Sequence, residues 1–145
     1  MIKKVRIKRF DKSIPLPEYK TSGATGFDFP AREQITIRAK EVTYVPLNAA
    51  IELPEGYFIL LAARSSLHKR GLIVANGVGI FDADFSDEED EYRAALYNFT
   101  DSDVIIEKGD RIMQGILIPF VRVDFEEVNE MGRGTRGGFG TTGVK

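Results

Sequence analysis

Two glycines, two carboxylates and phenylalanine fall within the ten residues from Asn76 to Phe85. Glycine has no side chain to hold a ligand away, so a glycine-rich hairpin can present backbone N–H and C=O groups to a flat ligand such as a nucleobase edge. On a strand, Asp82 and Asp84 would point to the same side as Ile80. Carboxylates beside an apolar residue are costly to desolvate and often have a chemical task. This stretch is therefore a candidate substrate pocket, and an Asp-rich turn that ends a strand is the simpler alternative.

The stretch from Ala62 to Leu67 combines a guanidinium group with two hydroxyl groups, where a predicted strand leads into a predicted helix. A helix N-terminus presents unpaired backbone N–H groups, which together with Arg64, Ser65 and Ser66 would form a phosphate site. A plain serine N-cap, with Arg64 in a surface ion pair, explains the same residues without a ligand.

Two more segments carry groups that could contact a nucleotide. Asp28 follows a glycine, where a turn role is the default and a magnesium role is the alternative. The segment 109–114 is a turn that leads into a strand. Within it, Arg111 could be one half of an ion pair and Gln114 an ordinary polar residue at a sheet edge.

The segment 133–145 is rich in glycine and has no apolar periodicity. It buries too little to offset the entropy of ordering it, so we expect a flexible arm, or one that orders on closing over a ligand or a neighbouring chain. Residues 1–132 are then the folded domain. Within the arm, glycine amides, hydroxyls and Arg136 surround Phe139, which is a suitable composition for a lid over a phosphorylated base.

Composition excludes several kinds of chemistry. The 145 residues include no cysteine, which excludes disulfides, thiolate nucleophiles and Cys-ligated metal sites. The one histidine, His68, lies in a polar turn, so a serine–histidine triad is not expected. A net charge of −2 gives no electrostatic footprint for stable nucleic-acid binding. No apolar run approaches the length of a membrane span or of a signal peptide, so we expect no membrane contact and a cytoplasmic setting.

Short alternating apolar segments, separated by Gly, Pro and Asn turns, predict an all-β sandwich or jelly roll. One short helix is expected at 65–70, with Gly71 just beyond its end in the left-handed conformation. The predicted strands are residues 2–9, 26–29, 34–37, 42–47, 49–53, 57–62, 79–81, 92–99, 104–106, 111–120 and 123–128.

Taken together and in this order, the segments resemble the five-motif pattern of the homotrimeric dUTPases, over about residues 24–143. The combination is far more specific than any one segment. The matching stretches are Ala24-Thr25-Gly26-Phe27-Asp28; Arg64-Ser65-Ser66-Leu67; Asn76 with Gly79-Ile80-Phe81-Asp82-Ala83-Asp84-Phe85; Gly109-Asp110-Arg111-Ile112-Met113-Gln114; and Arg136-Gly137-Gly138-Phe139-Gly140-Thr141-Thr142-Gly143.

This resemblance implies a jelly-roll-like β barrel in which three subunits build each active site. It also implies hydrolysis of dUTP to dUMP and pyrophosphate with Mg²⁺, which limits uracil incorporation into DNA and supplies dUMP for dTMP synthesis. Asp82 would be the general base, and Asp28 would contact the metal through water. Substrate contacts would come from Arg64, Ser65, Ser66, Gln114 and Arg136 at the phosphates, Asn76 and Gly79 at uracil, Phe85 at the sugar, and Phe139, Gly140 and Thr141 in the closing arm.

The residues fit this chemistry on their own terms. Uracil shows one N–H donor between two carbonyl acceptors, and an opened hairpin with an Asn76 amide can match them, whereas cytosine would leave groups unpaired. Phe85 would lie flat on the sugar and crowd out a 2′-hydroxyl. Hydrolysis at the α-phosphorus needs a positioned water and stabilised charge, with little covalent work for the protein.

The chain departs from the family pattern at four places. Ser66 stands where glycine is common, and Phe85 stands where tyrosine is usual. The glycine expected after Phe85 is replaced by a longer acidic run, 86–91. The arginine of the last motif commonly lies farther from the phenylalanine, so Arg133 could share the role given to Arg136.

Two other functions remain open at this point. A dCTP deaminase, or a bifunctional deaminase and dUTPase, shares the barrel and an Arg-Ser-Ser stretch. In that case Glu88, Glu89 or Glu91 would activate water. A catalytically idle nucleotide-sensing module would instead use the acidic run 86–91 as a partner surface, although charge runs are usually solvated loops.

Overall fold

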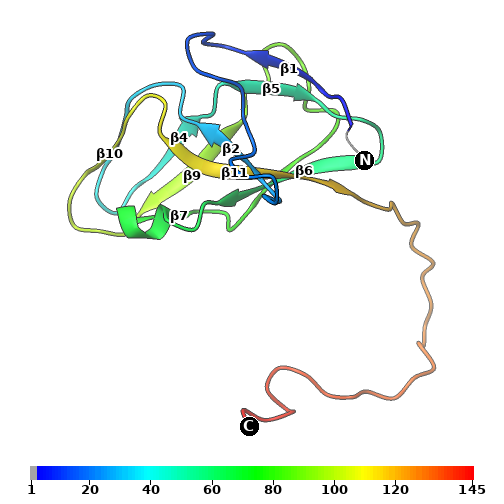
Figure 1. Cartoon of the computed structure of the whole chain (residues 1–145). Coiled ribbons are helices and arrows are strands. Elements are labelled where there is room, and N and C mark those ends of the chain that lie inside the picture. Colours follow the sequence, from blue (N-terminus) through cyan, green and yellow to red (C-terminus); the bar gives the residue numbers. More distant parts are fainter. Residues whose placement is uncertain (1–2) are drawn as a thin grey trace.

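A computed structural model describes residues 3–145 as an all-β fold with a single 3-10 turn (Figure 1). The elements are β1 (Arg6–Arg9), β2 (Phe27–Pro30), β3 (Ile35–Ile37), β4 (Val42–Pro46), β5 (Ala49–Glu52), β6 (Tyr57–Ala63), η1 (Leu67–Arg70), β7 (Leu72–Val74), β8 (Gly79–Phe81), β9 (Arg93–Asn98), β10 (Val104–Ile106) and β11 (Arg111–Pro119). The jelly-roll-like barrel that the sequence predicts is confirmed.

The longest strand, β11, organises the sheet that carries most of the candidate residues. It pairs antiparallel with β2 on one side and with β6 on the other, and β6 pairs in turn with β8. A second sheet has the order β4-β9-β7, and the pairs β1-β5 and β3-β10 complete the barrel. Strands that are distant in sequence therefore lie side by side, as in Figure 1.

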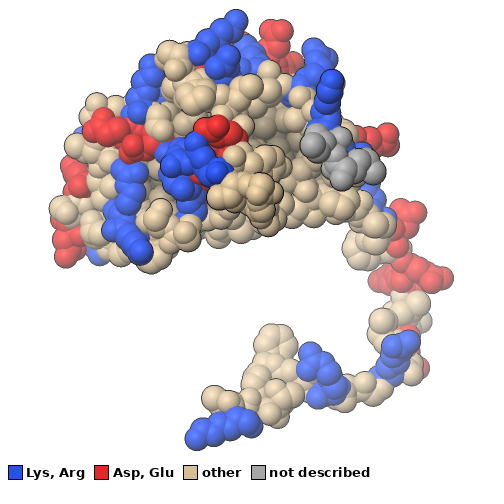
Figure 2. All heavy atoms as spheres, viewed as in Figure 1, with Lys and Arg blue, Asp and Glu red and all other residues tan. Residues whose placement is uncertain are grey.

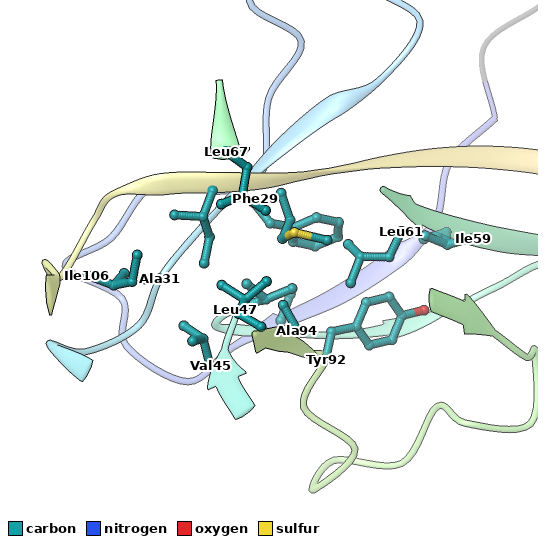
Figure 3. Close-up of a cluster of buried hydrophobic side chains, with 14 of the residues drawn as sticks. Phe29, Ala31, Val45, Leu47, Ile59, Leu61, Leu67, Tyr92, Ala94 and Ile106 are labelled. Carbon is teal, nitrogen blue, oxygen red and sulfur yellow. The ribbon is translucent and has the colours of Figure 1, made fainter. Parts of the chain in front are cut away.

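The core is a continuous cluster of buried apolar side chains between the sheets (Figure 3). Alternate residues of each strand point inward, as in β9, where Ala94 and Leu96 are buried and Arg93 is exposed. The largest fully buried side chains include Tyr92, Phe29, Leu61 and Leu96. The buried members of the cluster lie between Phe29 and Met113, so the barrel closes without the C-terminal arm.

The glycine-rich hairpin is open. Its two arms, β7 and β8, do not pair with each other in the described chain but belong to different sheets, β7 beside β9 and β8 beside β6. Gly77, with φ of 78°, takes the left-handed conformation at the turn between them. The sequence predicts β8 but not β7, because a three-residue strand directly after a helical turn is too short to show alternation.

Two predictions about local structure near the site are wrong. The helix expected at 65–70 is only the 3-10 turn η1, whose N-cap residue Ser66 makes no side-chain capping bond. Gly71 beyond it is left-handed with φ of 82°, as predicted. Asp82 and Asp84 are not on a strand, because β8 ends at Phe81 and a turn follows in which Phe85 N–H donates to Asp82 C=O at 3.2 Å.

The predicted strand at 123–128 is also wrong. These residues are exposed and pair with nothing in the described chain, although Val123 and Phe125 alternate with charged residues as they would on a half-buried strand. An isolated strand cannot satisfy its backbone groups or bury its apolar side, so the pattern alone does not form one. The segment leads away from the barrel, and the arm 133–145 continues it (Figure 1). Residue 2, which begins the predicted strand 2–9, lies outside the described residues.

Candidate functional site

The open hairpin encloses a cavity of about 360 Å³ between β8 and the β4-β9-β7 sheet. Asn76, Gly79 and Ile80 line it on the hairpin side, and Tyr44 and Arg93 line it on the other. Glycine suits position 79, since a Cβ atom would lie 3.1 Å from Cβ of Leu61 and 3.2 Å from Cε2 of Phe81, and these neighbours would have to shift to admit it. The two hairpin residues proposed for uracil, Asn76 and Gly79, therefore lie in one cavity, to which Gly79 contributes bare backbone.

Tyr44 and Arg93 are cavity residues that the sequence did not single out. Tyr44 is 65% exposed and Arg93 is exposed, so both have unused surface for a ligand. Tyr44 pairs with Ala95 and Arg93 pairs with Pro46, so the two side chains come from positions two residues apart along neighbouring strands. This placement depends on a strand register that the sequence does not specify.

Asp82 lies on the other side of β8, in the turn that follows it. Asp82, Ala83 and Asp84 line a cavity of about 540 Å³ together with residues of the β5–β6 turn and of the segment directly after β11, namely Glu55, Gly56, Phe120 and Arg122. Asp82 and Asp84 are both exposed, and no ion pair to either occurs within residues 3–145. The Asp82 carboxylate is thus free to bind a water molecule.

A second group of predicted residues meets where β2, β11 and β6 lie side by side. Asp28 is opposite Gln114 in the β2–β11 pair, and Gln114 is opposite Ala62 in the β11–β6 pair. The Gln114 side-chain amide donates to Ala63 C=O at 3.0 Å. Gly26 makes room for that side chain, since a Cβ atom there would lie 2.7 Å from Gln114 Oε1. The glycine of the first motif thus leaves the space that the glutamine side chain of the fourth motif occupies.

Two arginines neutralise Asp28, whose side chain is only 11% exposed. Arg64 Nε lies 3.3 Å from Asp28 Oδ2, and Arg111 Nη1 lies 3.1 Å from the same oxygen. Arg64 Nη1 also donates to Arg111 C=O at 2.9 Å. The buried carboxylate holds both guanidinium groups at one point of the surface, beside the exposed hydroxyls of Ser65 and Ser66. The ion-pair reading of Arg111 is thus confirmed.

This second group can bind an anion, but not through a helix dipole. The turn η1 has only four residues, so its macrodipole is small. The prediction that a helix N-terminus contributes to the phosphate site is therefore wrong. What remains is two cations, two hydroxyls and the Gln114 amide. Figure 2 shows acidic and basic side chains interspersed over this face of the barrel rather than one extended basic patch, in agreement with a small local site.

The two groups are separated within one chain. Gln114 lies in the row of Ala62, whereas Phe81, just before Asp82, lies in the row of Ile59 and Leu117. Gln114 and Phe81 are thus three residues apart along the strands and two strands apart across the sheet, which is about 10 Å in each direction. The Gln114 amide also points to Ala63, away from Asp82. One chain therefore does not bring Asp82 and Gln114 to the same reacting group.

The arm residues stand apart from both groups. Phe139 is fully exposed with φ of 52°, in a turn where Gly138 N–H donates to Thr141 Oγ1 at 2.7 Å. Arg133 and Arg136 are exposed, and within residues 3–145 neither forms an ion pair. Figure 1 shows this end of the chain away from the barrel. The arm residues thus remain available to a site on another surface.

The acidic run 86–91 is an ordered loop rather than a freely solvated one. Asp87 N–H donates to Asp90 Oδ2 at 2.9 Å, and Lys8 Nζ donates to Glu88 C=O at 3.0 Å. Glu91 is buried, and Arg32 contacts both of its carboxylate oxygens, at 2.6 and 3.1 Å. This contact raises the pKa of the Arg32 guanidinium. The run is therefore fastened to the barrel at its C-terminal end.

We expect Glu91→Gln to lower the free energy of unfolding by about 2 kcal/mol, because the amide loses a charge-assisted pair while Asn48 N–H, which donates to Glu91 Oε2 at 3.0 Å, keeps an acceptor. Urea unfolding at neutral pH measures this. Glu89→Gln, an exposed residue of the same run, is the matched control and should change stability by less than about 0.5 kcal/mol. Equal stability of the two variants would contradict the structural role of Glu91.

Comparison with known proteins decides which family these features belong to. The family model for dUTPase matches residues 12–143. The chain belongs to the dUTPase family. The deoxyuridine 5′-triphosphate nucleotidohydrolase of Hydrogenobaculum is 40% identical over 98% of this chain and 99% of that one, and that of Hahella chejuensis is 37% identical over 100% and 97%.

Solved dUTPase structures have the same fold. The dUTPase of Streptococcus mutans superposes with a TM-score of 0.75 at 30% identity, over 82% of this chain and 98% of that one. A variant of the dUTPase of Staphylococcus bacteriophage 80alpha, solved with dUpNHpp, gives a TM-score of 0.86 at 21% identity, over 99% and 100%. The second likeness establishes the fold alone.

No helix within residues 3–145 has the length and apolar character needed to cross a membrane.

The dUTPase family depends in general on a divalent metal ion. Within the described residues, no three His, Cys, Asp or Glu side chains gather to form a metal cage. Asp28 Oδ2 is taken by Arg64 and Arg111, and Oδ1 has no hydrogen bond in the part of the chain that the structure describes. These residues fit an ion held mainly by the substrate's phosphate oxygens, with Asp28 touching at most a coordinated water.

Proposed function

We propose that this protein hydrolyses dUTP to dUMP and pyrophosphate, in an active site that is completed by neighbouring copies of the chain. Membership of the dUTPase family supports the reaction. The single observation that supports its place in this chain is the open hairpin, whose cavity offers bare backbone and the Asn76 amide to one pyrimidine edge. A cytosine there would leave buried polar groups unpaired, which costs far more than an added methylene does.

Asp82 is proposed as the general base. Its carboxylate is exposed and unpaired within residues 3–145, and it sits in the turn directly after the hairpin strand, one residue beyond Phe81, which lines the hairpin cavity. It would orient a water molecule and accept its proton as the water attacks the α-phosphorus. Phe85 would lie on the sugar, and it is 37% exposed beside the same turn.

The phosphates are proposed to bind Arg64, Ser65, Ser66 and Gln114. Arg64 is held in place by Asp28, so little side-chain entropy is lost when it binds an anion. Arg136 would add a further cation and Phe139 would stack over uracil when the arm closes, with Gly140 and Thr141 forming the turn around it. A magnesium ion held by the triphosphate, with Asp28 contacting one of its waters, would neutralise phosphate charge.

The homotrimer is part of the proposal. Asp82 and Gln114 of one chain lie about 10 Å apart along the strands and about 10 Å across them. A complete site therefore needs the hairpin of one copy beside the phosphate-binding residues of another. The apolar residues of the segment leading to the arm, Val121, Val123 and Phe125, are also largely exposed within the described residues 3–145. Both features are accounted for if arms and hairpins are exchanged around a three-fold axis.

The other functions are less well supported. In a dCTP deaminase, a free glutamate after the hairpin would have to face the base, yet Glu91 is occupied by Arg32, and Glu88 and Glu89 do not line the hairpin cavity. An idle sensor module does not need an unpaired carboxylate at Asp82.

The test is an assay of purified protein with dUTP, UTP, dCTP and dTTP, measuring pyrophosphate and ammonia. We expect pyrophosphate from dUTP and no ammonia from dCTP. Ammonia from dCTP would transfer the assignment to a deaminase. Binding of dUTP without turnover of any of the four would favour a sensor.

A further inference from the structure

Two stacked aromatic rings close the base of the loop that carries Asp82. Phe81 ends β8 and Tyr92 precedes β9, and their ring centroids lie 3.8 Å apart at an interplanar angle of 11°. Phe85 lies against both, 6.0 Å from Phe81 and 6.1 Å from Tyr92. The exposed ring proposed to contact the sugar therefore lies beside this stacked pair, in contact range of both rings.

Tyr92 anchors this stack in the core. Tyr92 is 0% exposed. Its backbone N–H donates to Ala49 C=O at 2.8 Å, and its backbone C=O accepts from Leu47 N–H at 2.8 Å. Its ring lies 5.9 Å from the buried ring of Phe29, and Figure 3 shows it inside the apolar cluster. The neighbouring Glu91 is held by Arg32, so the backbone around Tyr92 is fixed on both sides.

The hydroxyl group of Tyr92 does not explain why a tyrosine stands here. It is buried, and it finds no hydrogen-bond partner among the residues that the structure describes. Burial also raises the pKa of this phenol, so the hydroxyl stays neutral. A buried unpaired hydroxyl weakens a fold. What the position uses is the ring, through its contacts with Phe81 and Phe85.

We propose that Tyr92 is a positioning residue that fixes the Phe85 ring and thereby sets how strongly the site prefers 2′-deoxyribose to ribose. The inference rests on the proposed function, in which Phe85 lies flat on the sugar. A ring held at a fixed height leaves no room for a 2′-hydroxyl, whereas a ring that can tilt away admits one. Discrimination of this kind depends on rigid exclusion rather than on added attraction.

The experiment compares kcat/KM for dUTP and for UTP in the full-length protein. Tyr92→Met keeps apolar volume but removes the ring, and we expect the dUTP/UTP ratio to fall about tenfold, the size of a lost aromatic contact. Tyr92→Phe is the matched control, and we expect it to keep the wild-type ratio within about twofold and to unfold at the same temperature or higher, since it removes only the unpaired hydroxyl.

A double-mutant cycle shows whether Tyr92 acts through Phe85. If it does, Tyr92→Met combined with Phe85→Leu lowers the ratio no further than Phe85→Leu alone. A folded Tyr92→Met protein with the wild-type ratio, or fully additive losses in the double variant, would overturn the inference. Should Tyr92→Met not fold, Phe81→Met, in the less buried half of the stack, is measured by the same criteria. Wild-type protein that does not cleave dUTP would count against the proposed function instead.

Discussion

Asp82→Asn should lower kcat for dUTP hydrolysis by about 10² to 10⁴-fold, the usual contribution of a general base. The amide keeps the shape of the side chain but cannot accept the water proton. Because Asp82 is exposed in a turn and makes no ion pair within residues 3–145, the substitution should leave the thermal unfolding temperature unchanged. Steady-state pyrophosphate release, with KM determined separately, measures the effect.

Asp84→Asn is the matched control for this prediction. Asp84 lies in the same turn, is equally exposed and lines the same cavity. A loss of rate in Asp82→Asn that Asp84→Asn does not share identifies the base, because a general change in the charge of the turn would affect both. Equal losses in the two variants would show that only the local charge matters, and full turnover in Asp82→Asn would refute the assignment.

Removal of residues 133–145 should abolish most turnover while the barrel stays folded. The core cluster lies between Phe29 and Met113 and the last strand ends at Pro119, so the deletion removes no buried side chain. We expect the urea midpoint to be unchanged and kcat/KM to fall by at least about 10²-fold, since a closing arm orients the phosphates and excludes water. A chain that lacks only Val144 and Lys145 is the control and should retain full activity.

The same truncated chain tests whether the active site is shared. When it is unfolded and refolded together with full-length Asp82→Asn, activity should return, because one chain supplies the arm and the other supplies the base. Two inactive chains that stay inactive when mixed would mean that each arm serves its own barrel. Sedimentation of the wild-type protein as a monomer at assay concentration would reject the trimer.

The sequence alone determined the all-β class, most of the strands and the family. Gly79 begins one short strand and Asp82 directly follows it. The sequence predicts this arrangement because it depends only on residues that are neighbours in the chain. The left-handed Gly71 is of the same kind, since a residue with φ of 82° after a helical turn favours glycine wherever the turn lies.

Only the tertiary structure decided which of these residues lie together. It joined Asp28 to Arg64 and Arg111 across three strands, and it separated Asp82 from Gln114, because strand register and sheet order depend on packing between distant segments. It also removed the strand predicted at 123–128, whose alternation is local but which finds no pairing partner within residues 3–145. Local chemistry can thus be read from the order of residues, whereas the assembly of a site depends on long-range contacts that the order does not fix.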